Sequence, residues 1–190
     1  MSYQQLSATT PIVLTDRVAN IEAELTAGEV ANLVGTHNYA GDFVPSALAT
    51  GGTDTTGIAT QLWVCELQIV KNTLLTGLSY LIGSVGGTDK AIAALYDSAG
   101  NLLANSALAG ATVGSASTFQ RLAFTATFQA KPGLYYVMVS TNGTTAHIQT
   151  QAAGDHNAGV ITAQTFGTLT TPITPPSTFT AAKAPIVMTY

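Results

Sequence analysis

The residues between Gln61 and Thr150 form short runs in which apolar and polar side chains alternate, and turn signals separate the runs. Successive side chains of a β-strand point to opposite faces, so a period of two residues is typical of a strand buried on one face. The clearest run is Gln61–Lys71, where one face is entirely apolar: Trp63, Cys65, Leu67 and Ile69. This alternation limits the fold more than any motif does, and it predicts an all-β domain.

Further segments repeat the pattern. Leu134–Ser140 is apolar on both faces, which predicts a central strand that is covered on both sides. Short strands separated by turns about 8–12 residues apart indicate a jelly-roll-like antiparallel β-sandwich rather than a parallel α/β sheet. The other expected strands are Thr73–Gly83, Lys90–Tyr96, Leu102–Ala104, Phe119–Phe128, Ala146–Thr150 and Ala184–Tyr190.

Two turns are predicted from their residue types. Asp97–Asn101 has Gly100 where a tight hairpin needs a left-handed residue, because glycine adopts positive φ without steric cost. Asn142-Gly143 is a strong type I′ signal, and it predicts a hairpin that joins Tyr135–Ser140 directly to Ala146–Thr150.

The chain divides into two parts on these grounds. Residues 1–60 are predicted to be an N-terminal arm followed by a long loop, with Thr50–Thr56 as the loop tip, and residues 61–190 are the sandwich domain. Thr15–Ala27 fits both a helix and a strand pattern, so its structure stays open. Gly167–Thr180 is rich in Thr and Pro, and Pro175-Pro176 favours a polyproline conformation.

Charge excludes some classes of function. Charged residues make up 8% of the chain, against roughly 25% in an average soluble domain. The net charge of −4 and the lack of a basic patch argue against nucleic-acid binding. No apolar run approaches the roughly 18–20 residues that span a bilayer, and no signal peptide is visible. Depletion of charge is expected where subunits bury surface against one another, so we expect a homo-oligomer.

Candidate metal ligands were weighed among the histidines and aspartates. His147 and His156 flank a loop that holds Asp155, but this spacing and that of His37 match no zinc pattern. Four aspartates lie in or beside turns, where turn formation is the commoner role than calcium binding: Asp42, Asp54, Asp89 and Asp97. We therefore predict no metal site and no cofactor.

The sequence also contains candidate catalytic and sugar-binding residues. Glu66 is the one glutamate on a predicted core strand, so no glycosidase-type carboxylate pair suggests itself, and we expect no enzyme. Cys65 lies on an apolar face and is the only cysteine, which predicts an inert core thiol. Exposed aromatic rings could stack on sugars, although packing is the default role at strand positions. The aromatic candidates are Tyr39, Tyr80, Tyr96, Tyr135, Tyr136 and Trp63.

Four stretches together resemble a family of tailed-bacteriophage structural proteins that carry a jelly-roll domain: GLSYLIGSVGGTDKAIAALYDSAGNLLANSA, STFQRLAFTATFQAKPGLYYVMVSTNGTTA, FGTLTTPITPPSTFT and the C-terminal API. The resemblance covers Gln61–Tyr190, and Met1–Asn32 matches it least. It implies a virion protein made in the host cytoplasm, most plausibly a decoration or cement protein on the head surface. Such a protein would assemble as a trimer or other small oligomer on the major capsid protein lattice.

One alternative from a different class stays open beside that resemblance. It is a carbohydrate-binding or receptor-recognition module of a tail fibre or baseplate, which would bind host surface glycans through exposed tyrosines.

Overall fold

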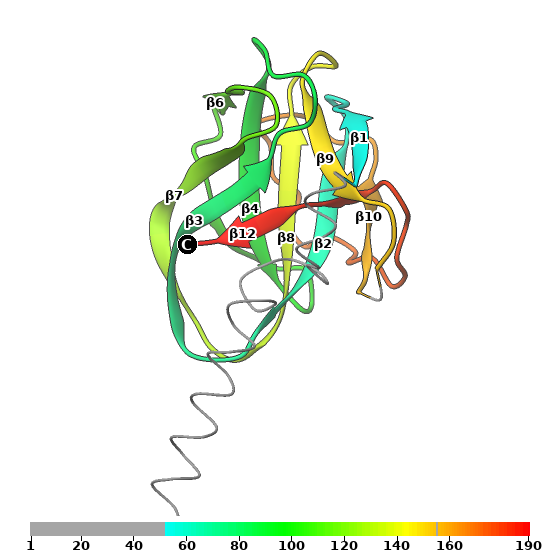
Figure 1. Cartoon of the computed structure of the whole chain (residues 1–190). Helices are drawn as coiled ribbons and strands as arrows, with labels where there is room; N and C mark the ends of the chain where they lie inside the picture. The colour runs from blue at the N-terminus through cyan, green and yellow to red at the C-terminus, as the bar shows by residue number, and fades with distance from the viewer. Residues whose placement is uncertain (1–51, 155) are drawn as a thin grey trace, which may run out of the picture. The chain divides into compact units, whose positions relative to one another are not determined.

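The computed structural model describes residues 52–154 and 156–190, and within these ranges the chain is all-β, without a helix. The predictions for the arm, for Thr15–Ala27, and for His37, Tyr39, Asp42 and Asp155 lie outside the described residues. The strands, shown in Figure 1, are β1 (Thr53–Thr56), β2 (Leu62–Ile69), β3 (Thr73–Leu81), β4 (Lys90–Asp97), β5 (Leu102–Asn105), β6 (Ala111–Thr112), β7 (Phe119–Ala130), β8 (Gly133–Thr141), β9 (His147–Gln151), β10 (Ala158–Ile161), β11 (Ala184–Pro185) and β12 (Val187–Thr189).

The strands form three antiparallel sheets. The largest has the order β10-β2-β8-β4-β5, with β6 paired to β4, and the two smaller sheets have the orders β12-β3-β7 and β1-β9-β11. A bridge between Ile82 and Ile148 links the two smaller sheets into one layer. Figure 1 shows β3, β7 and β12 stacked against β2, β4 and β8. The predicted all-β antiparallel sandwich is therefore confirmed.

The main core lies between the two layers. The six-stranded sheet contributes the apolar face predicted for β2, including Trp63 and Leu67, and both are at most 1% exposed. The second layer contributes Leu78 and Tyr80 from β3 and Ile148 from β9. The apolar residues at alternate positions of the strands therefore form a continuous apolar interior, because every second side chain of each strand faces the opposite sheet.

A second core covers the outer face of the six-stranded sheet. Strand β8 lies between β2 and β4, with Val137 and Val139 in the main core and Tyr136 and Met138 in the second core, so its prediction as a doubly covered central strand is confirmed. The cover comes from the Thr/Pro-rich segment, whose Ile173 is 4% exposed. This segment is consequently part of the packed domain.

The predicted hairpin at Asn142-Gly143 is wrong. Strand β8 pairs with β2 and β4, whereas β9 pairs with β1 and β11 in the other layer. Gly143 also lacks the positive φ that a type I′ turn requires. The connection crosses between layers instead, because the Asp89 carboxylate accepts hydrogen bonds from the backbone N–H groups of Thr145 and Ala146, both at 2.8 Å.

Two further predictions need correction. Thr50–Thr56 is not simply a loop tip, since Thr53–Thr56 forms β1 and pairs with β9, so the sheets include residues upstream of position 61. Alternation along Phe119–Phe128 predicts that Leu122, Phe124 and Ala126 share one buried face, but the structure buries only Leu122 and Phe124 and leaves Ala126 exposed. The reason is a bulge, because the β3–β7 register shifts between Leu75 and Gly77 and leaves Ala126 without a partner on β3.

Candidate functional site

A compact polar cluster joins three segments that are distant in sequence: Asp54 on β1, Ser84 after β3, and His147 at the start of β9. The Asp54 carboxylate accepts hydrogen bonds from the backbone N–H of Ser84 at 2.7 Å, from the Ser84 hydroxyl, and from Nδ1 of His147 at 2.6 Å. An ionised carboxylate only accepts hydrogen bonds, so Nδ1 must carry the proton in this arrangement. The three side chains form one hydrogen-bonded unit.

The backbone brings these residues together through sheet register. β1 and β9 pair so that Thr56 lies opposite His147, and the backbone N–H of Gly83 donates to the carbonyl oxygen of His147 at 2.9 Å. A Cβ on Gly83 would overlap the Asp54 carboxylate. Glycine is therefore required at position 83, because the Asp54 carboxylate approaches its Cα too closely for a side chain.

The electrostatics of Asp54 follow from two opposing effects. Partial burial is the largest single effect and raises its pKa, but the hydrogen bonds from Ser84 and His147 together outweigh it, so the net pKa of Asp54 is lowered. The side chains of His147 and Asp54 keep 23% and 35% of their surface exposed, respectively. Asp54 is thus ionised at neutral pH beside a histidine that solvent can reach.

This cluster has the residue types of a Ser-His-Asp triad but not its geometry. In a triad the carboxylate bonds one ring nitrogen and the nucleophilic hydroxyl bonds the other. Here the Ser84 hydroxyl bonds the carboxylate and lies 3.4 Å from the same Nδ1 atom, while Nε2 is 3.4 Å from the Thr56 hydroxyl. Ser84 is therefore not activated as a nucleophile, and the arrangement is suited to holding strands together.

The structure separates the two histidines that were weighed as a zinc pair. His147 contacts Asp54, whereas His156 is buried and packs edge-on against Phe179, with ring centroids 5.2 Å apart. Within residues 52–154 and 156–190, no three His, Cys, Asp or Glu side chains gather as metal ligands. Among the aspartates weighed for calcium, Asp97 caps its own hairpin by accepting from the backbone N–H groups of Ala99 and Asn101.

The other ionisable candidates serve the fold. Glu66 accepts a hydrogen bond from the backbone N–H of Asn157 at 3.1 Å, which fixes the loop before β10. Cys65 is fully buried, and this burial raises the pKa of its thiol far above the ordinary value. A buried thiol that remains protonated is unreactive, because the thiolate is the nucleophile.

The aromatic candidates for sugar stacking are mostly inside the protein. Tyr80, Tyr96 and Tyr136 are at most 5% exposed, and Trp63 is fully buried with Lys183 Nζ 4.7 Å from its ring centroid. Tyr135 is half-buried, and its hydroxyl donates to the carbonyl oxygen of Lys131 at 2.9 Å. In the described part of the chain these rings do not form an exposed platform on any of the three sheets.

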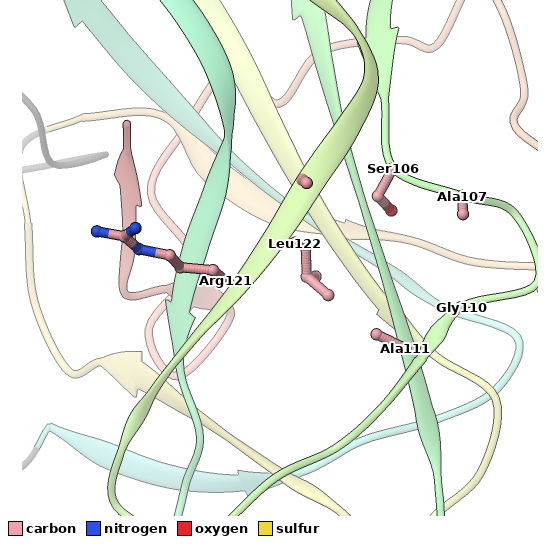
Figure 2. A pocket seen from close by; sticks show the side chains of 7 residues that line it. Ser106, Ala107, Gly110, Ala111, Arg121 and Leu122 are labelled. Atoms are coloured by element: carbon pink, nitrogen blue, oxygen red, sulfur yellow. The ribbon is translucent and has the colours of Figure 1, made fainter.

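A small pocket lies between β7 and the connection from β5 to β6, as Figure 2 shows. Its volume is about 120 Å³, and small side chains such as Ala107 and Ala111 line it. The Arg121 guanidinium points away from the pocket and stacks 4.7 Å from the Tyr190 ring centroid. Ligand sites usually measure roughly 300–1,000 Å³, so this pocket suits a few water molecules rather than a substrate.

The sequence marks Asp54 and His147 as separate candidates, and it gives no signal for Ser84. No local pattern marks Ser84, because its role depends on pairing between segments far apart in the chain.

In the part of the chain that the structure describes, no helix is long and apolar enough to cross a membrane. Comparisons with protein-family models, with curated proteins and with solved structures give no match.

Proposed function

We propose that this protein is a non-enzymatic structural component of a phage virion, and that it coats and stabilises the head as a decoration protein. The proposal starts from the resemblance of Gln61–Tyr190 to phage structural proteins. It is supported by the form of the molecule, a sandwich with one apolar core between its layers and another on the outer face of its largest sheet. Decorating a capsid lattice requires rigid surface area rather than a cleft.

The observation that carries the proposal is the exposed surface of β7. This is the longest strand described, and it ends the β12-β3-β7 sheet, with a single bridge to Ser106 at Phe124 on its outer side. Between Arg121 and Lys131 it has no charged residue, and its exposed positions there are small or polar: Ala123, Thr125, Ala126, Thr127 and Gln129. An uncharged edge strand is a natural template for contact with another chain, since charges are the usual protection against such contacts. We assign this surface to contacts between subunits, as a trimer or with the major capsid protein.

Thr127→Lys tests the β7 surface. The wild type is expected to be an oligomer, with a trimer favoured, and the variant is expected to be a monomer by light scattering. The physical reason is that an unpaired ammonium buried in an interface costs several kcal/mol. The melting temperature should change little, because Thr127 is exposed in the isolated chain.

The control for this prediction is Ser98→Lys, which adds the same charge at an exposed position of the β4–β5 hairpin. It should leave the oligomer intact. A Thr127→Lys protein that stays oligomeric would remove β7 from the interface, and a monomeric wild type would remove the homo-oligomer itself.

Antibody labelling of intact virions, viewed by electron microscopy, tests the location. Label over the head is the expected result. Label confined to the tail would overturn the decoration proposal in favour of receptor recognition, which a glycan-binding screen would then examine.

A further inference from the structure

Strand β1 is attached to the sandwich by polar contacts alone. Its sequence, Thr-Asp-Thr-Thr, has no apolar side chain, and none of its residues belongs to either core. Among residues 52–154 and 156–190 its one pairing partner is β9, over four residues. Its docking therefore depends on hydrogen bonds and charge rather than on the hydrophobic effect.

The polar contacts of β1 are of two kinds. Threonine contacts lie on one side, where the hydroxyls of Thr55 and Thr150 are 3.0 Å apart and the Thr150 hydroxyl donates to the carbonyl oxygen of Thr53 at 2.9 Å. The Asp54 carboxylate lies on the other, with its three donors from Ser84 and His147. The threonine hydroxyls do not titrate. Protonation of the Asp54 carboxylate, in contrast, removes a hydrogen-bond acceptor.

We propose that Asp54, Ser84 and His147 form an acid-sensitive clasp that holds β1 on β9, and that protonation of Asp54 releases β1 while the rest of the sandwich stays folded. Oδ2 of Asp54 faces two donors, the Ser84 hydroxyl and Nδ1 of His147. Protonation of this carboxylate places a further donor beside the Ser84 hydroxyl and Nδ1 of His147. It also removes the negative charge that both of these donors contact.

The direction of the pH effect follows from linkage. The pKa of Asp54 is lowered from the ordinary 3.8 by its hydrogen bonds, which outweigh the opposing effect of burial. A carboxylate with a lowered folded-state pKa contributes stability that is fully present above its unfolded pKa and is lost as pH falls through the folded pKa. The clasp is therefore closed at neutral pH, begins to weaken below the ordinary carboxyl pKa of 3.8, and opens as pH falls through the lower folded-state pKa of Asp54.

The other charged groups near the clasp are held by partners of their own. The segment after β3 also carries Asp89, whose carboxylate accepts from the backbone N–H groups of Thr145 and Ala146. Beside β11, Lys183 lies over the Trp63 ring. Asp54 on β1 and His147 on β9 are thus the titratable pair in direct contact, at 2.6 Å.

Release of β1 has a structural consequence. β1 is the first strand described after residue 51, so the clasp fixes the point at which the preceding chain joins the sandwich. Opening it would also free the edge of β9 from His147 to Thr150, which β1 now covers. Acid would thereby change the strand edge that the sandwich offers to other chains.

Amide hydrogen exchange on the full chain tests the clasp, with rates corrected for intrinsic exchange at about pH 6 and about pH 3. Protection in residues 53–57 is expected to fall at the lower pH, while β8 keeps its protection. Asp54→Asn should lack this protection at both pH values, and Ser84→Ala should lose part of it at the higher pH. Equal protection of residues 53–57 at both pH values in the wild type would overturn the proposal, as would simultaneous loss in β1 and β8.

Two control variants separate the clasp from general acid effects. Asp97→Asn removes another carboxylate whose pKa is lowered, chiefly by its hydrogen bond with Asn101, but one that lies in the β4–β5 hairpin, so the β1 response should persist. A disulfide formed by Thr55→Cys with Thr150→Cys should hold β1 in place and abolish the response. A locked variant that still loses protection in residues 53–57 would show that the change is not release of β1.

Discussion

Trp63→Ala is expected to lower the free energy of unfolding by about 3–5 kcal/mol, the usual cost of deleting a large buried aromatic side chain. Trp63 is fully buried in the main core, on a strand that β8 and β10 flank on both sides. The backbone around Trp63 is held by hydrogen bonds between paired strands. It therefore cannot collapse into the cavity that the substitution leaves. Within the described part of the chain the indole Nε1 has no hydrogen-bond partner, so the loss reports packing rather than a broken hydrogen bond.

Urea unfolding followed by circular dichroism measures this change, because the variant has no tryptophan left for fluorescence. Trp63→Phe is the matched control and should lose less, since it keeps an aromatic ring in the same site. A loss below about 1 kcal/mol for Trp63→Ala would mean that the ring does not fill the core as described.

Gly100→Ala is expected to destabilise the protein by about 2–4 kcal/mol, from two causes that act together. Gly100 has φ of +85° in the β4–β5 hairpin, a region that L-residues with a Cβ rarely adopt. A Cβ there would also overlap the carbonyl oxygen of Ile173, whose N–H donates to the Gly100 carbonyl oxygen at 2.9 Å. The substitution therefore strains the turn and pushes the Thr/Pro-rich cover away from the second core.

The control for Gly100 is Gly114→Ala. Gly114 lacks positive φ, and a Cβ there would meet Ile82 and Gln120 at ordinary contact distances of 3.8 and 3.9 Å. Thermal unfolding of both variants should show a large fall in melting temperature for the first and little change for the second. Similar melting temperatures would contradict the close approach of Ile173 to the hairpin.

The candidate site shows the limit of local patterns. Asp54 and Ser84 are 30 residues apart, and Asp54 and His147 are 93 apart. Each is unremarkable in its own stretch, so the sequence offered the residue types without their partners. Their contact arises because β1 pairs with β9 and the end of β3 bridges to β9, and long-range register of this kind cannot be obtained from periodicity along one segment.

Local chemistry was enough to predict most of the strands, though not β1, β6 or β10, and it also predicted the apolar face of β2, the doubly buried β8 and the Asp97–Asn101 hairpin with Gly100 at its left-handed position. These features depend on side-chain alternation and on backbone preferences within a few residues. The tertiary structure decided what pairs with what: the crossover at Asn142-Gly143, the docking of β1, and the covering of the outer sheet by Ile173 and its neighbours. The reason is physical, because an apolar face specifies that it must be covered but not which distant segment covers it, and that choice is made by shape, register and hydrogen bonding across the whole domain.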